Sequence, residues 1–139
     1  MNKTVLHKEI NSLYPTHLLA HARDAQYWTR LDPTTLDHRA VNALCGDDLR
    51  LTLRWSAASV VTAVGWSGDG CAISRASATL LGDRLMGMSI DAALHLRDED
   101  MLDMLGVSLP RSRRKCALLP LRALREGASA MGLDTKTTE

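Results

Sequence analysis

The stretch "LCGDDLRLTLRW", residues 44–55, decides the fold class, because its second half alternates strictly between apolar and polar side chains. The apolar row is Leu49, Leu51, Leu53 and Trp55, and the polar row is Asp48, Arg50, Thr52 and Arg54. A period of two indicates a β-strand with one face on a core and the other in solvent. We therefore expect the whole polar row to be exposed.

Two more β-rich runs flank this strand. The run "SVVTAVGWS", residues 59–67, follows after a short break and predicts an antiparallel hairpin with the first strand. The run "HRAVNAL", residues 38–44, precedes it and predicts a third strand. The sheet should end at the glycine-rich "GDGC", residues 68–71, because two glycines there break the β pattern.

After the glycine-rich stretch the apolar period changes to that of helices. Helices are predicted over residues 71–87, 89–96, 98–105 and 110–132, and an amphipathic helix broken by Pro15 is predicted over residues 6–23. Pro120 interrupts the last helix, which should either start later than residue 110 or kink just beyond Cys116. Strands followed by helices indicate an α+β fold, with a small antiparallel three-stranded sheet packed against several helices. We expect one domain over residues 1–139, with about 133–139 a frayed polar tail.

The balance of charged residues limits the kinds of partner that the protein can bind. Seventeen Lys and Arg residues face 16 Asp and Glu residues, so the net charge of +1 supplies no long-range field for nucleic acid or an anionic membrane. No run approaches the ~20 apolar residues that a membrane span needs, and the first residues lack the apolar segment of a secretory signal. We expect a soluble cytoplasmic protein that binds neither nucleic acid nor membrane.

The three cysteines carry the chemistry that the sequence suggests, although three buried, inert thiols are the plain alternative. Each is predicted at the edge of an element: Cys45 in a turn, Cys71 at a helix start, and Cys116 behind the basic "RSRRK". The positive end of a helix favours a thiolate, which is the form that binds metals and attacks electrophiles. With Asp47, three sulfurs and one carboxylate make a set within zinc's ligand repertoire.

Three motifs carry a family resemblance. The segments "NALCGDDLRLTL", "GDGCAISRASATLL" and "RRKCALLPLRAL" together resemble the U-type iron–sulfur cluster assembly proteins, the SufU and IscU family with its NifU-like N-terminal domains. The opening "LYPTHLLAHARDA" also resembles the family's first helix, so the likeness covers nearly the whole chain. The short interval from Cys71 to Cys116 resembles IscU, whereas "CAIS" and the pair Lys115–Cys116 resemble SufU.

The resemblance implies a metal site of Cys45, Asp47, Cys71 and Cys116, holding zinc or a transient iron–sulfur cluster. It implies that this site receives persulfide sulfur from a cysteine desulfurase of the SufS or IscS type. We expect Cys45 to be the acceptor, because a turn between strands can swing outward toward a partner. We expect Arg113 to be an electrostatic support for Cys116 or for a persulfide arriving nearby. Downstream cluster carriers or apo iron–sulfur proteins would receive the product. SufU-like zinc-dependent sulfur transfer and an IscU-like cluster scaffold both stay open, as does an approach of His21 or Lys115 to the metal.

The sequence also leaves two other functions open. The first is a thiol enzyme with Cys71 as the nucleophile at a helix N-terminus. The second is a degenerate member of the family whose zinc only supports the fold. Stimulation of a desulfurase by the native protein and by each cysteine variant separates the three.

Overall fold

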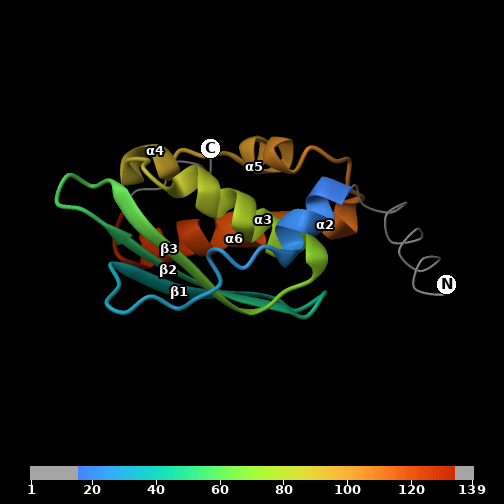
Figure 1. Cartoon of the computed structure of the whole chain (residues 1–139), viewed down its shortest axis with the longest axis horizontal. Helices are drawn as coiled ribbons and strands as arrows, with labels where there is room; N and C mark the ends of the chain where they lie inside the picture. The colour runs from blue at the N-terminus through green and yellow to red at the C-terminus, as the bar shows by residue number, and fades with distance from the viewer. Residues whose placement is uncertain (1–15, 134–139) are drawn as a thin grey trace.

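The computed structural model describes residues 16–133, which form an antiparallel sheet with helices layered over one of its faces (Figure 1). In chain order the elements are α2 (Thr16–Arg23), β1 (Leu36–Asn42), β2 (Asp47–Trp55), β3 (Val61–Asp69), α3 (Ala72–Leu85), α4 (Ile90–Ala93), α5 (Asp98–Leu105) and α6 (Arg111–Ala130). The predicted α+β class and the three-stranded sheet are confirmed.

The sheet has the strand order β1-β2-β3, with both pairs antiparallel, so the strand predicted from the alternation is central. Leu51 lies opposite His38 on one side and Trp66 on the other. Leu51, Leu53 and Trp66 are fully buried against the helices. Truncating one such leucine to alanine typically costs about 2–5 kcal/mol, so this face is the main source of stability.

The outer face of the sheet carries cross-strand ion pairs. Arg39 pairs with Asp48, and Arg50 pairs with Asp37 at 2.6 Å between Nε and Oδ1. The prediction of an exposed polar row is wrong for Thr52, which is buried. Its hydroxyl accepts a hydrogen bond from the Leu31 N–H and donates one to the Gly65 carbonyl, both at 3.1 Å. The loop before β1 lies over this point, and a period-two pattern cannot reveal such a cover.

Helix α6 packs across β1 and β2, while α3 lies beside it and contacts β3. The helix begins at Arg111 and continues through Pro120 to Ala130, so the alternative of a later start is wrong. Proline has no N–H and leaves the carbonyl of the residue four positions earlier, Cys116, without its usual helical donor. One residue further on, the Ser77 hydroxyl donates to the Ala117 carbonyl and ties α3 to α6.

The remaining elements follow the predictions, with α3, α4 and α5 inside the expected ranges. Helix α2 begins directly after Pro15, and the predicted helical segment before that residue lies outside the described residues. Of the tail expected to fray from about residue 133, only Leu133 is described, and it packs against the core. Over residues 16–133, no helix is both long and apolar enough to cross a membrane.

Candidate metal centre

The turn between β1 and β2 presents Cys45 and Asp47 to the same point. Gly46 between them has a φ of +73°, a left-handed conformation that side chains rarely adopt. This conformation reverses the chain, and the Cys45 Sγ lies 3.0 Å from the Asp47 Oδ2. Asp47 is only 2% exposed, although it stands at the first position of a strand.

Cys71 reaches the same carboxylate from the start of α3. It is the residue that precedes the first helical turn, in an extended conformation, and its N–H donates to the Asp47 Oδ1 at 2.8 Å. Its Sγ lies 3.5 Å from the Asp47 Oδ2. The carboxylate thus accepts a helix N-terminal amide, which is a favoured position for a negative charge.

Cys116 completes the group from α6, where it is fully buried. Its Sγ lies 3.1 Å from the Cys45 Sγ. Burial raises the pKa of the Cys116 thiol far above its usual range, and the hydrogen bond to Cys45 and the neighbouring Cys71 raise it further. This thiol is therefore protonated in the metal-free protein at neutral pH, and a metal that binds it must displace the proton.

The ligand atoms of Cys45, Asp47 and Cys116 all lie within 4.8 Å of one another, and Cys71 joins them through Asp47. Within residues 16–133, no Lys or Arg pairs with the buried Asp47 carboxylate. A buried carboxylate is costly unless a cation or a metal lies beside it. Three thiols and a carboxylate without a salt-bridge partner therefore form a donor set suited to a divalent cation such as zinc.

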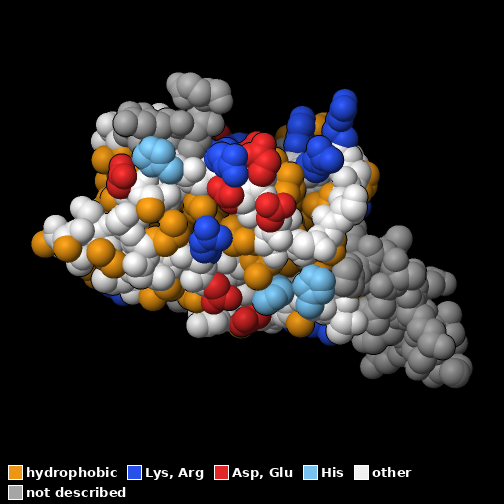
Figure 2. Space-filling model, turned by 90° about the horizontal axis from the view of Figure 1, so that it is seen from above, with side chains coloured by type: hydrophobic (Ala, Val, Ile, Leu, Met, Phe, Trp, Pro, Cys, Tyr) orange, Lys and Arg blue, Asp and Glu red, His pale blue; other side chains and the backbone are white. Residues whose placement is uncertain are grey.

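A hollow of about 820 Å³ opens over one side of this centre. It is lined by Leu44, Cys45, Arg111, Ser112, Arg113 and Lys115. Figure 2 shows Lys and Arg side chains gathered at the end of the molecule where α6 begins, next to acidic side chains over α5. Of the cysteines, Cys45 alone lines the hollow, so its thiol is the one that a visiting group meets, beside three cations.

Asp48, His21 and Lys115 are the remaining polar residues considered near the centre. Asp48, next to Asp47, points to the outer face of the sheet, where the hydrogen bond from Arg39 holds the pKa of its carboxyl below the usual range. His21 packs edge-on against His17, with ring centroids 6.5 Å apart. Lys115 lines the hollow together with Cys45.

Sequence reasoning overlooked the residues that hold the Cys45 turn. The Asn42 side chain accepts a hydrogen bond from the Leu44 N–H at 3.2 Å, a local turn typical of asparagine. Arg122 donates from α6 to the Val41 carbonyl at the end of β1. An asparagine three residues before a cysteine signals the first contact, whereas the second spans 81 residues and has no local signal.

Comparison with known proteins gives a family match. The model of the NifU-like N-terminal domain matches residues 14–137. The zinc-dependent sulfurtransferase SufU of Bacillus subtilis is 31% identical over 105 residues, covering 63% of this chain and 71% of that protein. The iron–sulfur cluster assembly scaffold protein IscU of Thermotoga maritima is 31% identical over 87 residues, covering 63% of this chain and 61% of that protein.

Solved structures agree on the fold. A putative iron–sulfur cluster assembly scaffold protein for the SUF system from Fervidobacterium islandicum has a TM-score of 0.70 at 20% identity, covering 84% of this chain and 97% of that one. The N-terminal part of a nitrogen-fixing NifU-like protein from Brucella abortus has a TM-score of 0.71 at 19% identity, covering 88% and 96%. At these identities the likeness establishes the fold alone.

Proposed function

This chain belongs to the NifU-like N-terminal domain family, the iron–sulfur cluster scaffold family of SufU, IscU and NifU, and from that membership we propose its reaction. It accepts persulfide sulfur at Cys45 from a cysteine desulfurase and passes on sulfur or a nascent cluster. One observation carries the proposal: three thiols and a buried carboxylate converge, and among the cysteines only Cys45 opens to a hollow rimmed by cations.

The ligands that would hold zinc are Cys45, Asp47, Cys71 and Cys116. When bound, zinc supplies a positive charge that keeps these thiols ionised at neutral pH. Its fit to the site rests on the Asp47 carboxylate, which is buried without a cationic partner within residues 16–133. A nascent iron–sulfur cluster is cargo for the same thiolates, because soft sulfur ligands suit both zinc and iron–sulfur centres.

Sulfur transfer needs no outside oxidant. The Cys45 thiolate attacks the terminal sulfur of the donor's persulfide, a new S–S bond forms on Cys45, and the donor's own S–S bond breaks. The donor cysteine leaves as a thiolate, so the charge moves from one sulfur to the other. Arg113 and Lys115 line the hollow beside Cys45 and would stabilise the anionic sulfur as it arrives.

The position of each ligand suggests which one moves. Cys45 stands in a turn between strands, whereas Cys71 and Cys116 belong to helices fixed by packing. Asp47 offers a hard oxygen, which holds a soft metal centre less well than a thiolate does. We expect Asp47 to yield first when a cluster is built or released, which makes the site labile.

Turnover of a cysteine desulfurase, measured with the native protein and each cysteine variant, tests the proposal. Native protein should stimulate sulfide or alanine production, and Cys45→Ser should remove the stimulation. A metal that served only the fold would leave desulfurase turnover unchanged by native protein. A thiol enzyme that used Cys71 alone would have no need of Cys45 or Cys116, so loss of activity in all three variants speaks against it.

A further inference from the structure

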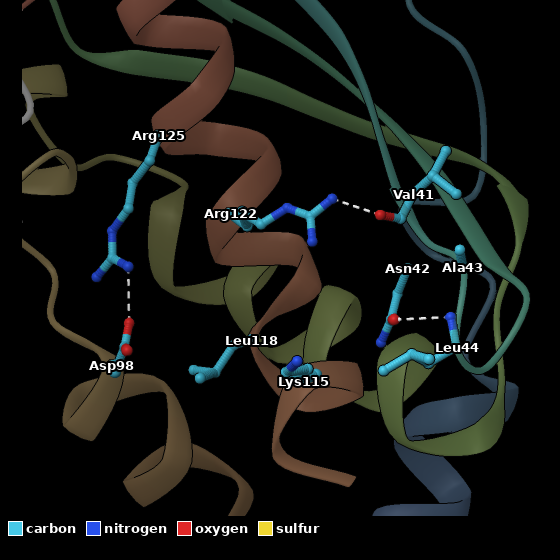
Figure 3. Close-up of a pocket in the computed structure, with 9 residues that line it drawn as sticks. All are labelled: Val41, Asn42, Ala43, Leu44, Asp98, Lys115, Leu118, Arg122 and Arg125. Carbon is cyan, nitrogen blue, oxygen red and sulfur yellow. Dashed lines mark hydrogen bonds and ion pairs between the residues drawn. The ribbon is translucent and has the colours of Figure 1, made fainter. Parts of the chain in front are cut away.

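A second hollow, of about 450 Å³, lies beside the candidate metal centre, between the β1–β2 turn and α6 (Figure 3). Its floor is a single stripe of α6: Lys115, Leu118, Arg122 and Arg125. These residues are three, four and three positions apart, so they share one helix face. We call this hollow the α6 groove. Ten residues of helix rise about 15 Å, the length of about four or five residues of extended chain.

The wall formed by the turn is apolar and exposed. Leu44 is 85% exposed, and it is one of the four exposed large hydrophobic residues among those described. Val41 faces the groove with its backbone carbonyl, while its side chain points away from α6 (Figure 3). Figure 3 shows the Leu44 side chain directed across the groove toward α6. Leu118 adds a half-buried apolar surface to the floor. Exposed apolar side chains gathered around a concave surface are typical of protein-binding sites.

The charge of the α6 groove is positive. Lys115, Arg122 and Arg125 contribute three cations, and Asp98 is the one carboxylate among the described residues that line it. Arg125 already holds Asp98, at 2.6 Å between Nη1 and Oδ1. Arg122 pairs with Glu126, at 3.0 Å between Nε and Oε2. Among the described lining residues, Lys115 is therefore the cation that no carboxylate holds, and electrostatic complementarity would guide an acidic partner to it.

The groove is shaped for side chains rather than for an added β-strand. β1 is an edge strand, and edge strands often accept a further strand through their backbone groups. Here Arg122 donates to the Val41 carbonyl, so that acceptor is already used. Figure 3 shows the Arg122 side chain spanning from α6 to this carbonyl at one end of the groove.

We propose that the α6 groove docks an extended peptide segment of a partner protein, in which aliphatic side chains alternate with carboxylates. The aliphatic side chains would lie against Leu44 and Leu118, and a carboxylate would meet Lys115. Leu44 and Lys115 line both this groove and the hollow over Cys45, so a segment seated here brings the rest of its protein over that thiol. This placement rests on the proposed function, because the partner is the protein that exchanges sulfur at Cys45.

Titration of the ¹⁵N-labelled full chain with a defined peptide, followed by NMR, tests the docking site directly. The probe is acetyl-Glu-Leu-Asp-Leu-Glu-amide, and the matched control peptide carries Gln and Asn in place of the acids. The acidic peptide should give saturable shifts at residues 41–44 and 115–125, with a Kd below about 1 mM. The control peptide should bind at least about fivefold more weakly, because it lacks the charge-assisted contacts.

Two variants with matched controls localise the binding. Leu44→Ser should weaken the acidic peptide at least about threefold, and Met131→Ser, another exposed apolar position, should leave it unchanged. Lys115→Gln should weaken it similarly, and Arg54→Gln on the outer sheet face should not. Shifts elsewhere, equal binding of both peptides, or no saturable shift would overturn the proposal.

One further outcome would show that the groove binds a small anion rather than a peptide. If acetyl-glutamate amide alone moved the same signals with equal affinity, the groove would be an anion site and the proposal would be wrong. Because the titration requires no desulfurase, it separates this inference from the proposed function. Peptide docking can be present where Cys45 fails to accept sulfur, and sulfur acceptance can persist where the peptide does not bind.

Discussion

Replacing Asp47 with asparagine separates a metal ligand from a structural hydrogen-bond acceptor. The carboxylate is 2% exposed and has no Lys or Arg partner within residues 16–133, so the metal-free fold bears its desolvation cost, which is several kcal/mol for a buried ion. Asparagine keeps an oxygen for the Cys71 N–H, but it loses the charge-assisted part of that bond and the weak thiol hydrogen bonds from Cys45 and Cys71 to Oδ2, about 1–2 kcal/mol in all. We expect a net stabilisation of the metal-free protein of about 1 kcal/mol, or about 3 to 5 °C in Tm.

In the zinc-loaded protein we expect Asp47→Asn to lower the Tm instead of raising it. Binding stabilises the fold in proportion to the logarithm of zinc concentration over Kd, so a lost ligand reduces the stabilisation. A weakening of zinc affinity by about 100-fold would remove about 2.7 kcal/mol, because each tenfold corresponds to about 1.4 kcal/mol. The assay is thermal unfolding of native protein and Asp47→Asn, each measured with a chelator and with excess zinc. The variant should melt higher with the chelator and lower with zinc.

Asp48→Asn is the matched control, since it makes the same change one residue away on the exposed outer face. It should leave the zinc-induced rise in Tm unchanged. The reasoning is refuted if Asp47→Asn melts below the native protein with the chelator and gains as much from zinc as the native protein does. Asp47 would then be a hydrogen-bond acceptor for the fold, with no part in metal binding.

Two further substitutions test the cations beside Cys45 and the ion pairs on the outer face of the sheet. Arg113→Ala should impair persulfide acceptance more than fold stability, while Arg114→Ala, next to it but outside the hollow, should leave acceptance unchanged. Equal rates for both variants and native protein would contradict the role of Arg113. The hydrogen bond from Arg50 holds the pKa of Asp37 below its usual 3.8, so the pair stabilises the fold above that ordinary value and loses this contribution as pH falls through the lower folded pKa. The difference in unfolding free energy between native protein and Arg50→Gln, measured in urea, should therefore shrink below about pH 4, and a difference that grew on acidification would contradict it.

Local patterns predicted most of the fold. The alternation through Leu49 and Leu53 identified the central strand because a side-chain period of two is a property of the strand itself. Thr52 was misplaced because the loop that covers it comes from residues about 20 positions earlier. Pro120 predicted either a later helix start or a kink just beyond Cys116, and the later start is wrong because α6 runs from Arg111 through Pro120, packed against the sheet and α3. The sequence correctly indicates that Pro120 destabilises the helix locally, but tertiary packing outweighs that cost.

The candidate site was predictable only where a motif marked it. Cys45, Asp47, Cys71 and Cys116 could be proposed from the family resemblance, but their convergence depends on three elements meeting in space. The α6 groove had no such signal. Its floor is a helical stripe that reads as an ordinary amphipathic pattern, and its wall is a turn about 70 residues away. Neither the helical stripe nor the turn indicates a groove by itself.

The site of persulfide formation tests the central claim most directly. Zinc-loaded protein would be incubated with a cysteine desulfurase and cysteine, alkylated, and mapped by mass spectrometry, with Cys45→Ser and Cys116→Ser treated in parallel. We predict a mass increase of one sulfur on the peptide that contains Cys45, its absence in Cys45→Ser, and its persistence in Cys116→Ser. Persulfide on Cys116 that is undiminished in Cys45→Ser would contradict the claim that Cys45 is the sulfur acceptor.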